Sequence, residues 1–459
     1  MNRYLYFIII ALFPMLLQAS VSVPPIFSSD MVMQRNESVK IWGKGNPGTT
    51  VELVPSWNKT VKVKVDKEGK WSTFLKTDNN QASHSLVIKD FESEIVLSDI
   101  WFGEVWLCGG QSNMAWKVVQ PIKDVREVPC IEADDMIEQS VKHKIRFFTT
   151  DRKGSKEPAD EVGGAWVRAD KETTKQCSAV AYSFAEKLSN ELNVPVGIVV
   201  SAVGGSKVEA WLDKETYDQF EPIPDITDKT PSNKVPCLLY NAMINPLKGF
   251  TVKGFIYYQG EANRHDPSRY AKTFPALIKL WRKQWEANLP FYFAQLAPYE
   301  YKEGDSYLIR EVQLETASKL KDTGVAITMD VGEEKSIHPR HKRPVGKRLA
   351  LQALANTYGH KDIVGASPVV KSCKAKNGKV YVTFDQNITV KDGELLELAG
   401  DNNEFKSARI ESAQGNQIVL SCDDVKQPSV LQYGYKNWAK ASLFGPTSLP
   451  VSSFRRTIK

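Results

Sequence analysis

The chain has 459 residues, a length that predicts two or three domains rather than one hydrophobic core. Its hydrophobic content of 42% and charged content of 25% are ordinary for a globular protein and exclude a disordered, collagen-like or polytopic membrane protein. The net charge of +6, from 60 basic and 54 acidic residues, is too small for this length to indicate a nucleic-acid partner.

The N-terminus has the pattern of a secretory signal peptide over residues 1–20. Asn2 and Arg3 form a short positive region, residues 5–17 form an apolar run, and Ala19 and Ser20 are small residues suited to cleavage. The run is shorter than the roughly 20 residues that a membrane-spanning helix needs. No other stretch is apolar enough to cross a membrane, so we expect a secreted or periplasmic protein without a membrane span.

Residues 21–98 predict an N-terminal β-sandwich domain. Short runs rich in β-branched residues at 51–54, 61–65 and 85–88 are separated by turn signals, and the alternation in 61–65 indicates one buried face. Residues 43–48 match the GxGxxG pattern, but a dinucleotide site needs a helix after it and strand-like sequence follows here. We therefore expect no nucleotide at this motif.

Residues 99–358 predict an α/β domain, because apolar strand-like runs alternate with helical stretches. The runs are 100–107, 194–200, 252–258, 291–296 and 325–329, and the helical stretches are 182–192, 270–285, 308–320 and 344–357. This order predicts a parallel sheet flanked by helices, with reactive residues at the carboxyl ends of the strands. Strand-like runs return at 379–384, 417–421 and 429–433, so residues 359–459 predict a C-terminal β-rich domain.

Polar or glycine-rich groups follow four of these strands. The first, at residues 109–114, puts Ser112 on a sharp turn, where its hydroxyl and its amide would both face the sheet edge. The second contains Gly204 and Gly205, which let backbone amides approach a ligand. The third, at 257–263, gathers a Gln, a Glu and an Asn beside a buried strand. The fourth carries His338 on a late loop, where the general base for a serine nucleophile would lie.

Each group also has a plainer interpretation. Ser112 could cap a helix, and the paired glycines could form an ordinary turn. A glycosidase would use Glu261 as acid or base, but it needs a second placed carboxylate, for which Glu209 is the obvious candidate. His338 and His341 have the spacing of metal ligands, yet no third ligand is evident and neither CxxC nor HExxH occurs. We therefore expect neither a metal nor another cofactor.

The six cysteines of an exported chain permit up to three disulfides, although their spacing shows no dense framework. Cys108 ends an apolar run, so we expect a buried thiol there. Cys373 and Cys422 share the last segment and are the first pair to test for a disulfide.

Together the four groups resemble the sialate O-acetylesterases and related carbohydrate esterases of the SGNH-hydrolase superfamily. The matching stretches are residues 103–114, 204–211, 257–263 and 337–350, and the resemblance extends to residues 24–28 and 33–35 and into the β-rich tail. It implies a flavodoxin-like parallel sheet flanked by β-rich domains. Four ordered motifs at strand ends are far more specific than any one of them.

The resemblance also implies roles for individual residues. Ser112 would be the nucleophile and His338 the general base. The amide of Ser112 would form the oxyanion hole together with Gly205 and with Gln259 or Asn263. We expect the remaining contacts to the substrate from the side chains of Gln111, Glu209, Glu261 and Arg340.

The chain departs from the superfamily at the third triad member. An Asp commonly lies two or three residues before the His, and those positions hold Ser336 and Lys335 here. A backbone carbonyl, Glu334 or Asp330 could orient the imidazole instead, and Asp330 is the candidate for the third catalytic residue. Because the usual acid is missing, we favour a Ser–His dyad oriented by a group other than a carboxylate.

The residues and the resemblance together predict a secreted serine esterase that removes acetyl groups from sialic acid through an acetyl-enzyme. One alternative is an acetylesterase that acts on acetylated xylan or another polysaccharide. An alternative of another class is a non-catalytic glycan-binding protein, although the presence of both Ser112 and His338 argues against it. Specificity would lie in loops such as 118–138 and 213–236, whose shape does not follow from their sequence.

Overall fold

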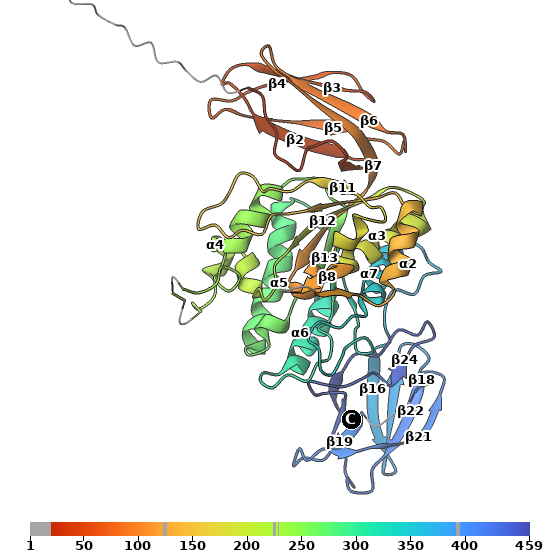
Figure 1. The fold of residues 1–459 in the computed structure, drawn as a ribbon. Helices are drawn as coiled ribbons and strands as arrows, with labels where there is room; N and C mark the ends of the chain where they lie inside the picture. The colour runs from red at the N-terminus through yellow and green to blue at the C-terminus, as the bar shows by residue number, and fades with distance from the viewer. Residues whose placement is uncertain (1–19, 123–125, 224–225, 228, 392–394) are drawn as a thin grey trace, which may run out of the picture.

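The computed structural model describes residues 20–122, 126–223, 226–227, 229–391 and 395–459. Almost all of the predicted signal peptide therefore lies outside the described residues. Figure 1 shows three parts that follow one another along the chain, namely a β-rich N-terminal part, a central part with helices around a sheet, and a β-rich C-terminal part. No helix within the described ranges is long and apolar enough to cross a membrane.

The N-terminal part contains two antiparallel groups of strands, the second of which is continuous with the central sheet through β7 (Glu94–Gly110). One pairs β2 (Ser38–Lys44) with β5 (Lys70–Lys76), and the other joins β3 (Thr50–Pro55) to β4 (Val61–Lys64) and β6 (His84–Lys89). Alternate residues are buried along β2 and β3, as a half-buried strand requires. The GxGxxG segment ends β2 and leads into β3, so the strand expected after it is confirmed.

A single long strand, β7 (Glu94–Gly110), connects the N-terminal part to the centre of the molecule. Its first residues pair with β6, and its later residues pair with β1 (Val32–Gln34) and then with two strands of the central sheet. The predicted boundary between residues 98 and 99 falls inside this 17-residue strand. The two parts therefore share a continuous backbone element instead of being joined by a linker.

The central sheet places β7 in its middle. Its order is β11-β10-β12-β7-β13-β14-β15, and all pairs are parallel except the one that β11 makes at the edge. The bounds are β10 (Ile145–Thr149), β11 (Trp166–Arg168), β12 (Val196–Ala202), β13 (Gly254–Tyr258), β14 (Phe291–Ala294) and β15 (Thr323–Ala326). The predicted parallel sheet flanked by β-rich regions is confirmed.

Helices cover both faces of this sheet and bury two hydrophobic clusters. Along β13, Phe255 and Tyr257 belong to one cluster, while Ile256 and Tyr258 belong to the other, because successive side chains of a strand point to opposite faces. The first cluster includes residues of α5 (Pro267–Gln284), which packs beside α6 (Ser306–Lys319), and the second includes residues of α3 (Ala179–Leu192) and α7 (Lys342–Asn356). Shorter elements are α1 (Ser112–Ala115), β8 (Val119–Ile122), β9 (Arg126–Pro129), α2 (Ala133–Gln139) and α4 (Lys214–Tyr217).

The C-terminal part contains two four-stranded sheets and a short strand pair. One sheet has the order β16-β17-β22-β21 and the other β20-β19-β23-β25, while β18 pairs with β24. The bounds are β16 (Val370–Lys376), β17 (Lys379–Phe384), β18 (Thr389–Val390), β19 (Leu396–Ala399), β20 (Lys406–Ser407), β21 (Arg409–Gln414), β22 (Gln417–Ser421), β23 (Val430–Tyr433), β24 (Leu443–Phe444) and β25 (Phe454–Thr457).

The cysteines are all described, and all six are free thiols. Cys108 is buried, as expected. The disulfide considered for Cys373 and Cys422 does not form, because Cys373 lies on β16, Cys422 follows β22, and β17 lies between these two strands.

Candidate active site

Four loops meet at the carboxyl edge of the central sheet. They follow β7, β12, β13 and β15, which are the strands whose ends carry the predicted motifs. Because all four strands run parallel in one sheet, their carboxyl ends lie on the same edge. Residues that are more than 200 positions apart in the chain are therefore neighbours here.

Ser112 begins helix α1 directly after the end of β7. The turn between them needs a glycine at position 110, where φ is +139° and a Cβ atom would lie 2.2 Å from the carbonyl oxygen of Tyr258. The first amides of a helix have no acceptor within the helix, so the N–H of Ser112 is free of intrahelical bonds. This turn therefore presents both the hydroxyl and the amide of Ser112 at the sheet edge.

His338 lies on the loop between β15 and α7 and faces Ser112. The distance between its Nε2 atom and Ser112 Oγ is 2.9 Å. The imidazole packs against the ring of Trp116 with 4.9 Å between ring centroids, and Ser336 Oγ bonds both the amide and the carbonyl of His338. These contacts hold the imidazole in reach of the serine hydroxyl.

The electrostatic environment of His338 favours the neutral imidazole. Burial, and to a smaller extent the nearby charge of Lys342, lower the pKa of His338 to about 4. At neutral pH the ring therefore carries a free lone pair that can accept a proton from Ser112. That is the protonation state that a general base needs.

Asp330 points to a different partner. Its two carboxylate oxygens accept hydrogen bonds from Arg348, both at 2.6 Å, and Arg348 also donates to the carbonyl of Ile327. The Glu334 carboxylate lies 3.9 Å from Lys335 Nζ. Within the described part of the chain, no carboxylate is hydrogen-bonded to the imidazole of His338. The Ser–His dyad that the sequence favoured stays a prediction.

The predicted oxyanion donors differ in what their groups contact. Gly205 has a φ of +67°, and a Cβ atom on the neighbouring Gly204 would lie 3.6 Å from the Cβ of Ser112, so this turn runs beside the nucleophile. Gln259 donates to the carbonyl of Ser206 and to the side-chain oxygen of Asn263. Both N–H groups of the Gln259 amide are thus used within the protein.

Asn263 is held in a chain of buried groups. Its side-chain oxygen accepts from the amide of Val208, and its Nδ2 donates to Glu209, which in turn is paired with Arg269 at 2.9 Å. Glu209 is fully buried, so its carboxylate is a brace for this loop. Glu209 takes one of the two N–H groups of Asn263 Nδ2, so Asn263 stays a predicted oxyanion donor beside the backbone amides of Ser112 and of the glycine turn.

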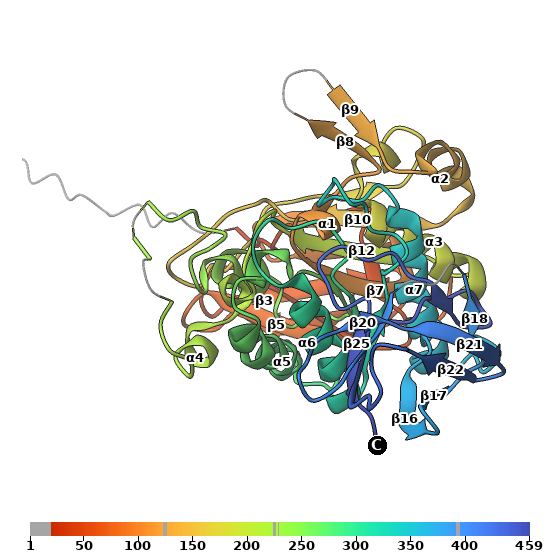
Figure 2. The ribbon, with the colours of Figure 1, turned by 90° about the horizontal axis from the view of Figure 1, so that it is seen from below.

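The other predicted substrate contacts are distributed between the interior and the surface. Gln111 is buried, and its side-chain oxygen faces the amides of Gly260 and Ala262 at 3.4 and 3.3 Å. Arg340 is exposed and donates to the carbonyl of Pro129 at the end of the β8–β9 hairpin. The hairpin itself projects from the rest of the molecule in Figure 2. The roles of these residues toward a substrate stay predictions.

Two residues of the site, Asn113 and Lys342, were given no role in the sequence reasoning, and a third, Glu261, makes contacts that it did not foresee. Asn113, next to the nucleophile, donates to Glu261 and to the carbonyl of Ile337, and it accepts from Lys342. Glu261 was expected to contact the substrate, but it is only 2% exposed. The adjacency of Asn113 to Ser112 was the one signal that could have identified it, because the partners lie far away in sequence.

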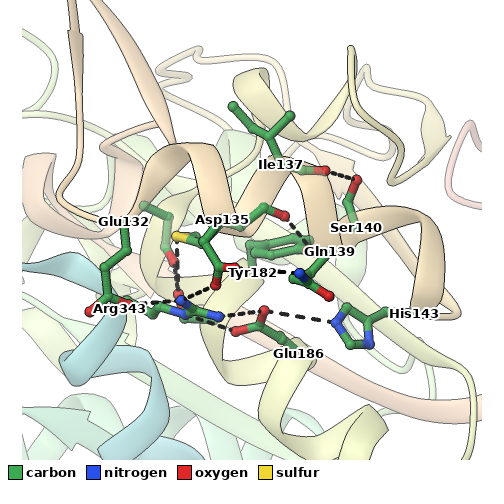
Figure 3. Close-up of polar contacts among 12 residues, drawn as sticks. Glu132, Asp135, Ile137, Gln139, Ser140, His143, Tyr182, Glu186 and Arg343 are labelled. Carbon is green, nitrogen blue, oxygen red and sulfur yellow. Dashed lines mark hydrogen bonds and ion pairs between the residues drawn. The ribbon is translucent and has the colours of Figure 1, made fainter.

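A cluster of charged residues connects α7, the helix after the histidine loop, to α2 and α3. Figure 3 shows the guanidinium of Arg343 among the carboxylates of Glu132, Asp135 and Glu186. These residues belong to α7, to α2 with the residue before it, and to α3. The predicted specificity loop 118–138 is therefore tied to the helix that follows the histidine loop.

The described ranges contain no group of three His, Cys, Asp or Glu side chains that could hold a metal ion. His338 contacts Ser112 through Nε2, and Glu209 and Glu261 are each bonded to other protein groups. The contact between His338 Nε2 and Ser112 Oγ is the one that can support nucleophilic attack by an activated serine.

Comparison with known proteins points in the same direction. A family model described as a carbohydrate esterase, sialic acid-specific acetylesterase, matches residues 103–355. The sialate O-acetylesterase of Homo sapiens is 28% identical, with 93% of this chain and 91% of that protein covered, and the one of Mus musculus is 30% identical, with 80% of each covered. The crystal structure of a carbohydrate acetylesterase from Xanthomonas citri is similar with a TM-score of 0.86 and 32% identity, over 95% of this chain and 99% of that one.

Proposed function

Because the chain belongs to the family of sialic acid-specific acetylesterases among the carbohydrate esterases, we propose that it removes O-acetyl groups from sialic acid with Ser112 as nucleophile. The class of reaction, hydrolysis of a carboxylic ester, follows from the family. The observation that supports the serine mechanism is the 2.9 Å contact between Ser112 Oγ and His338 Nε2.

The reaction begins with attack of Ser112 Oγ on the carbonyl carbon of the acetyl ester. His338 Nε2 takes the hydroxyl proton as the bond forms. The negative charge that develops on the carbonyl oxygen is stabilised by the amides of Ser112 and Gly205, with the side chain of Asn263 as a further candidate donor. The tetrahedral intermediate collapses, the sugar oxygen takes the proton from His338, and the sugar leaves as an alcohol. Water then attacks the carbonyl carbon of the acetyl-enzyme while His338 takes a proton from it. The bond between the acetyl group and Ser112 Oγ breaks, His338 returns the proton to Ser112, and acetate leaves.

The environment of His338 suits this sequence of proton transfers. Its lowered pKa, about 4, keeps the base neutral before attack, and the imidazolium that forms is a strong acid toward the leaving sugar oxygen. Trp116 and Ser336 hold the ring and its backbone without a carboxylate partner. A serine–histidine dyad thus supplies the transfers that the reaction requires.

The N-terminal sequence supports export as part of this function. We propose that residues 1–20 direct the chain out of the cytoplasm and are removed, because a charged start, an apolar run and small residues follow one another there. Sequencing the N-terminus of the protein recovered outside the cytoplasm tests this. A mature chain that still begins at Met1 would contradict it.

The substrate is tested by measuring acetate release from 9-O-acetylated sialic acid and from acetylated xylan under the same conditions. We expect release from the sialic acid and a loss of at least about a thousandfold in Ser112→Ala and in His338→Ala. Preferred release from xylan would move the substrate to plant polysaccharides, and no release from either or from p-nitrophenyl acetate would favour a glycan-binding protein.

A further inference from the structure

The side chain of Asn113 connects the nucleophile to the base. Asn113 follows Ser112 in the chain, and its Nδ2 donates to the carbonyl of Ile337, the residue before His338, at 3.1 Å. Asn113 is 1% exposed, so water does not compete for this bond. Any rotation of the Asn113 amide would therefore shift the histidine loop relative to the serine turn.

Two buried charged groups determine which way this amide points. Lys342 Nζ donates to the Asn113 oxygen, while Glu261 accepts from the Asn113 nitrogen at 2.5 Å. Below about pH 7 Lys342 is an ammonium group, which can only donate, and an ionised carboxylate can only accept. A flipped amide would place two donors together and two acceptors together, so Lys342 and Glu261 exclude that orientation.

We propose that Lys342 and Glu261 are positioning residues of the esterase, which fix the Asn113 amide and so set the distance between Ser112 and His338. The inference rests on the proposed serine mechanism and deepens it. Both residues are buried, with Lys342 0% and Glu261 2% exposed, and both are hydrogen-bonded to the Asn113 amide. Their effect on the reaction passes through the geometry and the charge around the dyad.

The charges around Lys342 define a second route by which it acts. The groups that face its ammonium are Glu261 on the β13 loop, Glu333 on the histidine loop and the Cys130 thiol before α2. The ring of Trp116, which also packs on His338, lies 5.5 Å from Lys342 Nζ. Burial lowers the pKa of Lys342 to about 7, so the ammonium is charged throughout the acidic range in which His338 titrates.

Lys342→Met tests both routes, because a Met of similar length fills the space without a donor or a charge. We expect kcat on p-nitrophenyl acetate to fall roughly ten- to a hundredfold with KM nearly unchanged, since a small misplacement of the reacting groups costs this much. We also expect the acid limb of kcat/KM to move to higher pH by on the order of one unit, because a like charge next to His338 is removed.

Two further variants separate positioning from folding. Asn113→Asp removes the donors to Ile337 and Glu261, so its loss of kcat should exceed that of Lys342→Met. Glu261→Gln keeps an oxygen that can accept from Asn113, so its kcat should stay within about threefold of the parent protein. If only stability were at stake, losses of kcat would follow the melting temperatures of the three variants instead of this order.

Lys335→Met is the matched control for charge. Lys335 lies on the same loop three residues before His338, but its side chain is 78% exposed and paired with Glu300, so water and salt screen its charge. We expect no shift of the acid limb in this variant. A Lys342→Met protein that is folded and keeps the parent kcat and acid limb would overturn the proposal, and so would a Glu261→Gln protein impaired as strongly as Asn113→Asp. Full activity of Ser112→Ala would instead refute the serine mechanism itself.

Discussion

Replacing Asp330 by Asn separates a catalytic carboxylate from a structural one. In the structure Asp330 forms a two-pronged ion pair with Arg348 at 2.6 Å, and the two side chains are 20% and 10% exposed. The pair is neither a surface salt bridge, worth up to about 1 kcal/mol, nor a fully buried one, whose disruption costs about 3–5 kcal/mol. We therefore expect Asp330→Asn to lower the free energy of unfolding by about 2 kcal/mol.

The same geometry predicts little change in turnover. A loss of about 2 kcal/mol corresponds to a fall in melting temperature of roughly 4–8 °C for a domain of this size, which differential scanning calorimetry measures. The kcat of Asp330→Asn on p-nitrophenyl acetate at 25 °C should stay within about threefold of the parent value, because the Asp330 carboxylate is hydrogen-bonded to Arg348 and not to His338.

The refuting result is equally clear. Loss of the orienting carboxylate in a serine hydrolase costs on the order of ten-thousandfold in kcat. Such a loss in Asp330→Asn, at an unchanged melting temperature, would show that a carboxylate orients the imidazole during turnover. Glu334→Gln is the matched control, because this acid is nearer to His338 in sequence, its side chain is 45% exposed, and it should affect neither quantity.

Three further predictions concern the site and its supports. Because the pKa of His338 is lowered to about 4, kcat/KM should stay level as the pH falls through 6.5 and decline only near pH 4; a decline centred at 6.5 would contradict this. Gly110→Ala should melt well below the parent protein, since its Cβ would lie 2.2 Å from a carbonyl oxygen, whereas Gly204→Ala should melt within about 2 °C of it; equal melting of the two would refute the steric argument. Arg343→Met should increase hydrogen exchange in α2, because it removes the ion pairs to Glu132 and Asp135; Glu186→Gln, which removes the pair of Arg343 with α3, should change exchange in α2 less, and equal effects of the two variants would contradict this.

Most of the sheet could be predicted because strands buried on both faces are continuous apolar runs. The exceptions have physical reasons. Strand β10 was not predicted, since Arg146 interrupts its run; the arginine is nevertheless buried, stacked on Trp101 at 3.4 Å and paired with Asp99. The strand predicted at 325–329 is shifted relative to β15 (Thr323–Ala326), because Ile327 and Met329 are apolar for another reason: they pack beside Ala439 of the C-terminal part.

The candidate site shows the same division. Ser112 and His338 follow parallel strands, so their place at the same edge of the sheet could be predicted from alternation. Their contact could not, because β13 and β14 lie between β7 and β15 and the loop of His338 has to cross that distance. The partner of Asp330 could not, because its bond to Arg348 depends on how α7 packs under the loop. Asn113 and Lys342 are 229 positions apart, and a sequence pattern does not predict a hydrogen bond between side chains so far apart in the chain.

The continuous strand β7 has a consequence for how the molecule melts and how it can be engineered. From residue 98 to Gly110 the strand is about 40 Å of extended chain, with N-terminal pairing at one end and the serine turn at the other. Gln34 adds a second link between the two parts, because its side-chain oxygen accepts a hydrogen bond from the amide of Val105 inside the central sheet. Exchanging the N-terminal part between relatives would require a junction inside strand β7. For the same reason, both parts should unfold in one cooperative transition.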